Sequence, residues 1–321
     1  MPAWRSKVQV ERELAGFSPK CDSLITIGVF DGVHLGHKHL ISKVKELASQ
    51  QGLCSIAITF DKHPQEILTP QTQPPFLTDA TEKADLLKKE GVDAVIVLTF
   101  TEELSRLSAR QFILLLQQEL RLKGLVIGPD FALGHKGEGN IPFLRQLGIE
   151  LGFSVTVIPP VRNNGDIVSS TAIRKAMADG DMEKVCRLMG RPFSLHGNVV
   201  RGKGRGVGLG FPTVNLNISP GQAIPPDGVY ATLAHLDHES YPSVTNVGMN
   251  PTFNNTERTI ESYLLDYHDN LYGRLVKIDF IHKLRNEIKF KDAQELTQQI
   301  ARDIELARQA LKDELAALKT I

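Results

Sequence analysis

Two histidines three residues apart follow a short apolar run near the start of the chain, in the segment 25–44, ITIGVFDGVHLGHKHLISKV. The apolar run predicts a buried strand and the residues after it predict a helix, so a glycine-rich turn opens the helix N-terminus. Free backbone N–H groups and the positive helix end favour an anion there. His34 and His37 would share a face of the first helical turn and could both hydrogen-bond a phosphate whose charge is changing.

Other interpretations of this histidine pair stay open on the residues alone. Two histidines at this spacing could ligate a metal, or His34 could only cap the helix. The order strand, glycines, helix favours phosphate chemistry. The pattern HxGH resembles the signature of the nucleotidyltransferase and class I aminoacyl-tRNA synthetase superfamily, which cleaves ATP between its α and β phosphates.

A second group of polar residues stands at another predicted helix start, in VSSTAIRKAM. Ser169, Ser170, Thr171 and Arg174 would offer hydroxyls, backbone amides and a guanidinium to triphosphate oxygens. Alone the pattern is weak, because Ser and Thr are ordinary N-caps and Arg174 could be a solvated helix residue. Together with the histidine pair it predicts one nucleotide site.

The segment 201–216, RGKGRGVGLGFPTVNL, is a third candidate. Glycines alternate with basic or small residues, which on composition could equally be a flexible linker or an RGG-like RNA-binding segment. On the residues alone, these two interpretations stay open.

These candidates need two different scaffolds. Between about residues 23 and 161, short β-branched runs alternate with longer amphipathic stretches, which predicts βαβ units and a parallel sheet covered on both faces. After Phe193, short strands separated by Gly- and Pro-rich turns predict an antiparallel barrel or sandwich. Apolar residues at steps of three and four from Leu296 to Leu311 predict a terminal helix packed on it. We expect two domains, 1–190 and 191–321, with the boundary at the Arg191-Pro192 pair.

Composition excludes several classes of protein. Lys plus Arg equals Asp plus Glu at 37 each, so we predict no nucleic-acid partner and no membrane partner. The three cysteines, Cys21, Cys54 and Cys186, are widely spaced and odd in number, so we expect reduced thiols rather than a disulfide or a cysteine-based zinc site. Charges interrupt the first 14 residues before any apolar run could act as a signal peptide, which predicts a cytoplasmic protein.

At this point the sequence resembles a known family, the bifunctional bacterial riboflavin kinases and FMN adenylyltransferases (prokaryotic FAD synthetases). The resemblance runs through GVFDGVHLGH, TFDKHP, PFLTDATEK, GPDFALG and VSSTAIR, and then through FPTVNL, PPDGVYA, TNVGMNPTF, IESYLLDY, LYGRLVKIDF and LRNEIKF. It implies an N-terminal Rossmann-like nucleotidyltransferase domain and a C-terminal riboflavin kinase-like β-barrel with a terminal helix. It also implies the conversion of riboflavin to FMN and of FMN to FAD, with ATP and Mg²⁺.

For the adenylyltransferase half, the resemblance assigns two sets of residues. The catalytic histidines would be His34 and His37, and the candidate ATP-binding residues are Gly28, Phe30, Asp31, Gly32, His34, Gly36, His37, His63, Ser170, Thr171 and Arg174. The candidate FMN-binding residues are Asp130, Phe131 and Lys136. The family's usual segment reads DFRFG and then a basic residue; here DFALG is followed by His135 and Lys136, so we expect Lys136 to supply the charge.

For the kinase half, the resemblance assigns ATP binding to Gly202, Gly204, Gly206, Gly208, Gly210, Thr213 and Asn215. Thr213 and Asn215 would hold the Mg²⁺ of MgATP, because neutral oxygen ligands suit a hard cation that shares phosphate oxygens. Glu261 would be the general base for the ribityl hydroxyl, and Arg285 would lie near the flavin. Two departures from the family pattern are Val214 in place of Ala and Tyr263 in place of His.

Two other functions remain as hypotheses. The altered DFALG segment could mark a chain that keeps only the kinase, and the Gly/Arg stretch could belong to an RNA- or nucleotide-binding regulator. Equal numbers of acidic and basic residues, and few aromatics near RGKGRG, count against the regulator.

Overall fold

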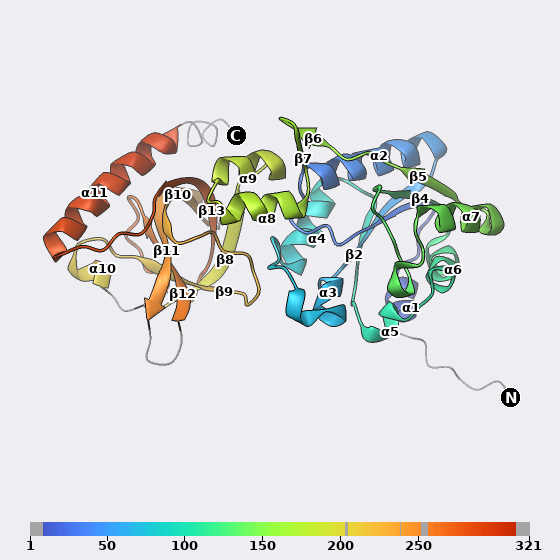
Figure 1. Ribbon diagram of the computed structural model, residues 1–321, viewed down its shortest axis with the longest axis horizontal. Helices are drawn as coiled ribbons and strands as arrows, with labels where there is room; N and C mark the ends of the chain where they lie inside the picture. Colours follow the sequence, from blue (N-terminus) through green and yellow to red (C-terminus); the bar gives the residue numbers. More distant parts are fainter. Residues whose placement is uncertain (1–8, 203–204, 238, 252–255, 313–321) are drawn as a thin grey trace. The chain divides into compact units, whose positions relative to one another are not determined.

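The computed structural model describes residues 9–202, 205–237, 239–251 and 256–312 of the chain. Contacts between Cα atoms divide the chain into two compact units, residues 1–170 and 171–321. Each unit is described separately below, and Figure 1 shows the elements of both.

A five-stranded parallel sheet forms the centre of the first unit, in the order β3-β2-β1-β4-β5. Its strands are β1 (Ser23–Ile27), β2 (Cys54–Phe60), β3 (Ala94–Leu98), β4 (Leu122–Ile127) and β5 (Ser154–Val157). All five residues of β1 are buried, as expected for the central strand of a sheet with both faces covered. The predicted parallel sheet is confirmed.

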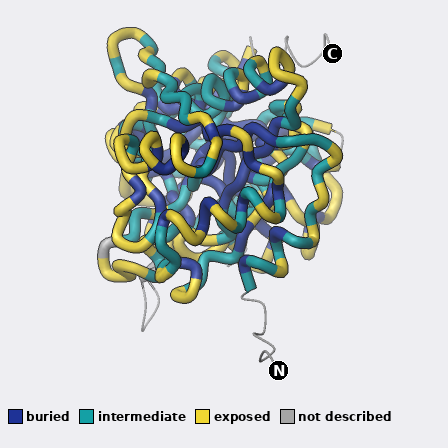
Figure 2. Tube along the Cα trace, turned by 90° about the vertical axis from the view of Figure 1, so that its right-hand side faces the viewer, coloured by how far each residue is buried: buried dark blue, intermediate teal, exposed yellow. Residues whose placement is uncertain are grey.

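Helices cover both faces of this sheet. On one face, α1 (Gln9–Ala15), α5 (Glu102–Ser105), α6 (Ala109–Leu120) and α7 (Ile141–Leu151) share a core with alternate strand residues such as Ile25 and Ile58. On the other face, α2 (Leu35–Gln51) and α4 (Ala80–Lys89) pack against the intervening residues, including Leu24 and Ala57. The tube in Figure 2 shows buried positions gathered toward the centre and exposed positions mostly at the periphery.

The loops of the first unit carry short elements that the sequence patterns did not predict. These are α3 (Pro64–Leu68), η1 (Pro70–Thr72), η2 (His135–Gly137), β6 (Arg162–Asn163) and β7 (Asp166–Ile167). The last two pair as a small antiparallel ribbon. Each is too short to give a periodic signal in the sequence.

The prediction of reduced cysteines is wrong for one pair. Cys21 and Cys54 form a disulfide with a Cα–Cα distance of 5.8 Å. The parallel pairing of Ser23 with Cys54 brings them together, since Cys21 lies two residues before β1 and Cys54 begins β2. The crosslink closes a loop with a sequence separation of 33. Closing a loop of that length lowers the entropy of the unfolded chain, which raises the free energy of unfolding by roughly 3–4 kcal/mol.

The second unit is built on a closed antiparallel barrel with the strand order β10-β11-β12-β9-β8-β13. Its strands are β8 (Phe193–Val200), β9 (Val214–Ile218), β10 (Gly228–Leu236), β11 (Glu239–Pro251), β12 (Thr256–Leu264) and β13 (Leu275–Arg285). Closure removes the sheet edges and decides between the barrel and the sandwich that the strand spacing left open. Large aromatic side chains, Phe193, Tyr230 and Phe280, fill the interior.

In the described part of the second unit, four helices accompany the barrel: α8 (Ser170–Ala178), α9 (Met182–Met189), α10 (Arg205–Gly208) and α11 (Ala293–Ala310). The predicted apolar stripe of the terminal helix is confirmed, because Ala307 and Leu311 are fully buried against β10, β11 and β13. The contacts between Cα atoms place α8 from Thr171 onward, and all of α9, in the same unit as the barrel. Helix α9 packs on β8 and β13. The predicted domain boundary at residues 190 and 191 stays a prediction.

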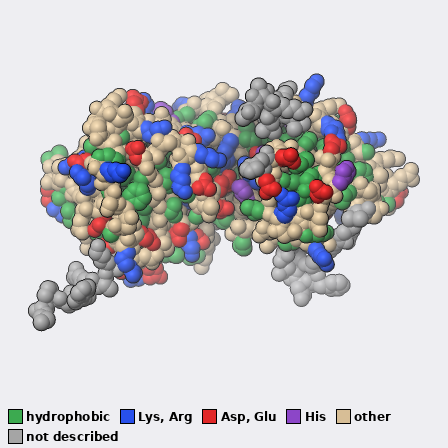
Figure 3. All heavy atoms as spheres, turned by 180° about the vertical axis from the view of Figure 1, so that it is seen from behind, with side chains coloured by type: hydrophobic (Ala, Val, Ile, Leu, Met, Phe, Trp, Pro, Cys, Tyr) green, Lys and Arg blue, Asp and Glu red, His purple; other side chains and the backbone are tan. Residues whose placement is uncertain are grey.

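Charged side chains of both signs are interspersed on the face shown in Figure 3, in keeping with their equal numbers in the sequence. Among the described residues, no helix combines the length and apolar character needed to cross a bilayer.

Candidate active sites

The turn after β1 has an unusual backbone. Phe30 has φ 51°, Gly32 has φ 83° and Val33 has φ 37°, so three of four consecutive residues adopt the left-handed region. A β-branched residue such as Val33 is strained there, and strained residues that the fold holds in place are typical of functional sites. The amide of Gly28 donates to the Ile58 carbonyl at 3.0 Å, which fixes the start of the turn on β2.

His34 is the N-cap of α2, and its Nδ1 accepts a hydrogen bond from the His37 amide at 3.3 Å. The capping role that the sequence left open is therefore present. Because Nδ1 is an acceptor, a neutral His34 carries its proton on Nε2. The two imidazoles are stacked at 3.6 Å between ring centroids, and the Phe30 ring meets His37 edge-on at 5.2 Å.

The glycines of this turn lie against neighbouring side chains that leave little room for a Cβ. A Cβ on Gly28 would lie 3.0 Å from the Phe30 ring, and one on Gly36 would lie 3.1 Å from the His34 ring. A Cβ on Gly32 would lie 2.9 Å from Leu77, at a φ that disfavours any other residue. The glycines therefore set the positions of the rings around the histidine pair.

Asp31, a candidate ATP-binding residue, is buried and holds the turn to the segment before α4. Its Oδ1 accepts from the amides of Leu77 at 2.8 Å and Thr78 at 3.1 Å, and Thr78 Oγ1 accepts from the Gly32 amide at 3.0 Å. Ser170 Oγ donates to the Asp31 carbonyl at 2.9 Å. These bonds connect three segments of the first unit around the histidine turn.

Burial makes His37 a neutral group. The residue as a whole is only partly buried, but its Nδ1 is inaccessible and has no hydrogen-bond partner among the described residues. Desolvation lowers the pKa of His37 well below its usual 6.5, and the neighbouring His34 and Lys83 lower it further. At pH 7 His37 is thus a hydrogen-bonding imidazole rather than a cation.

Three other predicted residues of this half lie on helix α8 or at the N-terminus of helix α3. Thr171 is exposed and Arg174 is half-buried on α8 in the second unit, so their relation to the histidine pair stays a prediction. His63 caps α3, its Nδ1 accepting from the Gln65 amide at 3.2 Å. Sequence reasoning did not predict this capping role.

The candidate FMN segment lies beyond the carboxyl end of β4. Asp130 and Lys136 are exposed, and Lys136 has φ 54° within η2. Phe131 instead packs partly against the core shared by the sheet and α6. The two charged residues are therefore accessible to a ligand, whereas Phe131 is partly buried against the core.

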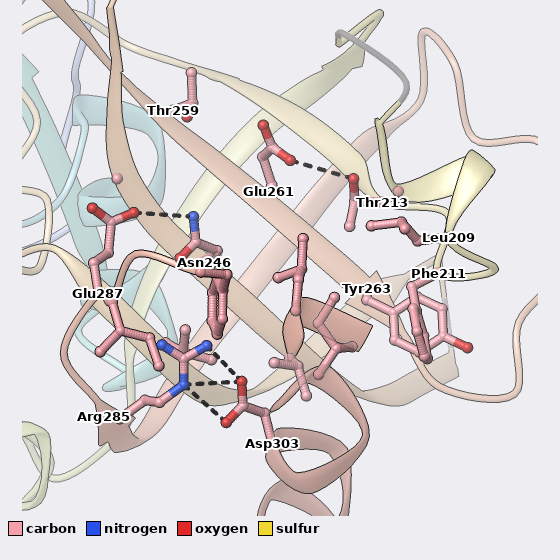
Figure 4. Close-up of a pocket in the computed structure, with 18 of the residues that line it drawn as sticks. Leu209, Phe211, Thr213, Asn246, Thr259, Glu261, Tyr263, Arg285, Glu287 and Asp303 are labelled. Carbon is pink, nitrogen blue, oxygen red and sulfur yellow. Dashed lines mark hydrogen bonds and ion pairs between the residues drawn. The ribbon is translucent and has the colours of Figure 1, made fainter. Parts of the chain in front are cut away.

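A cavity of about 350 Å³ lies between the barrel and α11, within the size range of small-molecule sites (Figure 4). Glu261 on β12 is half-buried and lines it, and Glu261 Oε2 accepts a hydrogen bond from Thr213 Oγ1 at 3.5 Å. Asn215 is the direct partner of Glu261 across the β9–β12 pair. Thr213, Asn215 and Glu261 therefore share one face of these strands, as the two-residue period of a strand requires.

The glycine-rich stretch before β9 folds closely onto this face. A Cβ on Gly202 would lie 2.2 Å from the Asn215 amide group, and one on Gly206 would lie 2.3 Å from the Phe211 carbonyl oxygen. Gly208 and Gly210 have no atom within 4 Å of a built Cβ, so they leave open space. Gly204 lies outside the described residues.

Arg285 lines the same cavity, and its orientation is set by a residue that the sequence analysis missed. Its Nε and Nη2 donate to the carboxylate of Asp303 on α11 at 2.7–3.0 Å, and its guanidinium lies 5.8 Å from the Phe290 ring centroid. Asp303 is only 2% exposed and also accepts from Gln299. Nothing in the sequence indicated this pair, since Asp303 looks like a surface position of an amphipathic helix.

Two further polar residues on the cavity wall were also missed. Asn246 on β11 donates to Glu287 at 3.5 Å (Figure 4). A Cβ on Gly248 would lie 2.0 Å from the Glu287 carboxylate. Tyr263, one departure from the family pattern, packs edge-on against Phe211 at 5.6 Å. Leu296 and Ile300 of α11 supply apolar lining.

A second cavity of about 300 Å³ adjoins β9 and is lined by Pro212, Thr213, Tyr267, His268 and Tyr272, among others. Thr213 lines both cavities. Arg201, at the start of the glycine-rich stretch, lies 5.9 Å from the Tyr272 ring centroid.

Comparison with protein families gives two matches in chain order. The FAD synthetase family matches residues 17–172, and the riboflavin kinase family matches residues 189–311. The first match contains the histidine turn, and the second contains the barrel with both cavities.

Known proteins match over nearly the whole chain. A bifunctional riboflavin kinase/FMN adenylyltransferase of Listeria monocytogenes is 35% identical over 88% of this chain and 90% of its own. Proteins with the same description from Escherichia coli and Pseudomonas fluorescens are 37% and 36% identical, covering 91% and 94% of this chain and 94% and 97% of their own.

Among solved structures, a protein of Streptococcus pneumoniae described as a macrolide-efflux protein superposes with a TM-score of 0.84 at 28% identity, over 94% of this chain and 97% of that one. The two family matches and the full-length relatives agree on one assignment. The chain belongs to the family of bifunctional riboflavin kinases/FMN adenylyltransferases.

Proposed function

We propose that the two activities of this family are divided between the two units, with FAD made at the histidine turn and FMN made in the barrel. The observation that carries this division is that each unit has its own set of residues suited to phosphate chemistry. The histidine turn offers imidazoles and backbone amides, whereas the barrel offers a carboxylate beside a threonine hydroxyl.

The chemistry of FAD formation suits the first set. An oxygen of the FMN phosphate attacks the α-phosphorus of ATP, the bond between the α-phosphorus and the bridging oxygen breaks, and pyrophosphate leaves. The nucleophile is already anionic at pH 7, so no general base is needed, and catalysis consists of alignment and charge stabilisation. His34 and a neutral His37 supply hydrogen bonds to the α-phosphate, and Ser170, Thr171 and Arg174 are assigned to the other phosphates.

The chemistry of FMN formation suits the second set. The 5′-hydroxyl of riboflavin is a neutral nucleophile, so a carboxylate that accepts its proton lowers the barrier as the oxygen attacks the γ-phosphorus of ATP. Glu261 is half-buried in the larger cavity and is placed to take this proton. ADP is the leaving group.

We assign the flavin to the larger cavity and ATP to the smaller one. The larger cavity joins the apolar side chains of α11 to the polar residues Arg285, Asn246 and Glu261, which suits a flavin ring with a hydroxylated chain. The smaller cavity offers Tyr267 and Tyr272, whose rings suit an adenine base. Thr213 lies between them, where a phosphoryl group would pass.

Mg²⁺ fits the residues of the kinase site. Thr213 and Asn215 present neutral oxygen atoms on the face that carries Glu261, and hard oxygen donors of this kind suit a cation that is also bound by phosphates. No group of three or more His, Cys, Asp or Glu suited to a metal exists in the described part of the chain, so most of the ligands would come from ATP and water. When bound, Mg²⁺ neutralises phosphate charge. Because ATP is a substrate of both reactions, we also propose that the protein acts in the cytoplasm.

Incubation with riboflavin, ATP and Mg²⁺, followed by chromatography of the flavins, tests the proposal. We expect FMN to appear first and FAD to follow, with FAD also formed when FMN replaces riboflavin. FMN without FAD would select the kinase-only hypothesis, and the absence of both products would reject the proposed function.

A further inference from the structure

A buried carboxylate interrupts the apolar face of the terminal helix. Leu296, Ile300 and Asp303 follow one another at steps of four and three on α11, so they share the helix face that lines the larger cavity. Asp303 is only 2% exposed. Burying a carboxylate is costly unless it is paired and hydrogen-bonded, so the partners of Asp303 are the first evidence of its role.

Two partners satisfy the carboxylate of Asp303. Both of its oxygens accept from Nε of Arg285 at 3.0 Å, and Oδ2 also accepts from Nη2 at 2.7 Å. Oδ1 accepts in addition from Nε2 of Gln299, one turn earlier on α11, at 2.8 Å. Figure 4 shows the carboxylate turned toward the guanidinium. The helix therefore holds one edge of the Arg285 side chain.

The other contacts of Arg285 fix its guanidinium further and leave part of it available. Nη1 donates to the Asn286 carbonyl at 3.0 Å, and the guanidinium lies 5.8 Å from the Phe290 ring centroid, within the range of a cation–π contact. A guanidinium has five N–H groups. Among the described residues, the bonds to Asp303 and Asn286 take three of them, so two remain for a ligand of the cavity that Arg285 lines.

Attachment of the helix to the barrel does not by itself require this ion pair. Ala307 and Leu311 already bury the apolar stripe of α11 against the strands, and an apolar residue at position 303 would extend that stripe. Replacing a buried ion pair with well-packed apolar residues is often neutral or stabilising. What the carboxylate adds is a fixed direction for the guanidinium, because paired N–H···O bonds hold its plane.

The surroundings of Arg285 suit the ring of a flavin rather than its hydroxylated chain. Leu296 and Ile300 supply apolar wall within two turns of Asp303 on the same helix face. Figure 4 shows Glu261 and Thr213, which would meet the 5′-hydroxyl, on a different side of the cavity from Arg285. The isoalloxazine ring is flat and largely apolar, and its pyrimidine end carries two carbonyl oxygens that accept hydrogen bonds.

We propose that Asp303 is a positioning residue for the flavin, because it holds Arg285 so that the remaining N–H groups donate to the carbonyl oxygens of the isoalloxazine ring. This inference rests on the proposed function of the barrel, in which riboflavin occupies the larger cavity. Asp303 acts through Arg285 and not on the ligand itself. The ring is then held at its pyrimidine end, and the ribityl chain extends toward Glu261.

Asp303→Asn tests the inference, because asparagine keeps the shape of the side chain but replaces the carboxylate with an amide that cannot pair both oxygens with the guanidinium. Riboflavin should bind roughly 10–100-fold more weakly, the usual worth of a hydrogen bond to a charged group. Its KM should rise by a similar factor, while kcat and the KM for ATP stay within about twofold of the wild type. Binding is measured by calorimetry on the full-length protein.

Three comparisons separate recognition of the ring from other effects. Lumichrome, which has the ring but no ribityl chain, should lose affinity for Asp303→Asn by the same factor as riboflavin. Asp266→Asn, which breaks the exposed ion pair between Asp266 and Arg308 of the same helix, should leave both affinities unchanged. In an Arg285→Met background, Asp303→Asn should weaken binding no further, because Asp303 acts through Arg285.

Wild-type affinity for riboflavin in a folded Asp303→Asn overturns the inference. So does lumichrome that fails to bind the wild type or binds the variant equally well, or a KM for ATP that rises as much as the KM for riboflavin. If Asp303→Asn does not fold, Asp303→Leu decides, since leucine extends the apolar stripe and leaves Arg285 unheld: weaker binding of both ligands supports the inference, and wild-type binding contradicts it. Failure of the proposed function is distinct, because the wild type would then form no FMN from riboflavin and ATP.

Discussion

Replacing His34 with asparagine should reduce FAD formation from FMN by roughly 10²–10³-fold, the usual cost of removing one donor that stabilises developing charge. FMN formation from riboflavin should stay at the wild-type level. Asparagine is the informative substitution because His34 is also the N-cap of α2, and asparagine caps helices well. The loss can then be attributed to the imidazole rather than to the start of the helix.

Two comparisons support this test. His34→Ala removes the cap as well, so it should lower the stability of the first unit by about 1 kcal/mol in addition to losing activity. His39→Asn, on the same helix and without an assigned role, should retain both activities. An equal loss of FMN and FAD formation in His34→Asn would contradict the division of labour between the units.

Glu261→Gln should have the opposite effect, reducing FMN formation from riboflavin by roughly 10²–10⁴-fold, the usual contribution of a general base. Glutamine has nearly the same shape and can still accept the hydrogen bond from Thr213, so the cavity should remain intact. FAD formation from supplied FMN should continue. Both activities are measured by separating the flavins after incubation with ATP.

The matched control is Glu239→Gln, an exposed glutamate on β11 outside the cavity, which should change neither activity. If FMN formation proceeded unchanged in Glu261→Gln, another carboxylate of the cavity wall would have to be the general base. Glu287 would then be the first candidate, because it is the other glutamate that lines the cavity.

The scaffold was largely predictable because its signals are local. A buried strand followed by glycines and an amphipathic helix places His34 and His37 at a helix N-terminus, and period-two runs after Phe193 give the strands that close the barrel. The same locality made Thr213 and Glu261 recognisable, since each lies in a short motif. Their contact depends on strand register, which the structure supplied by pairing Glu261 with Asn215.

The features that escaped prediction all depend on contacts between distant parts of the chain. Lys83 and Asp303 look like surface residues of amphipathic helices, and only tertiary packing reveals that both are buried, Lys83 against the Phe60 carbonyl and Asp303 against Arg285. The Cys21–Cys54 disulfide was rejected on cysteine number and spacing, yet neighbouring parallel strands bring the two residues together. Odd cysteine numbers do not exclude a single crosslink.

The central claim is that one ATP is attacked at its outermost phosphorus in the barrel and another at its innermost phosphorus at the histidine turn. Riboflavin incubated with ATP radiolabelled at either position tests this directly. We predict that the γ-label enters FMN and is carried into FAD, whereas the α-label enters FAD and never FMN. An α-label in FMN, or FAD that lacks the α-label, would contradict the account.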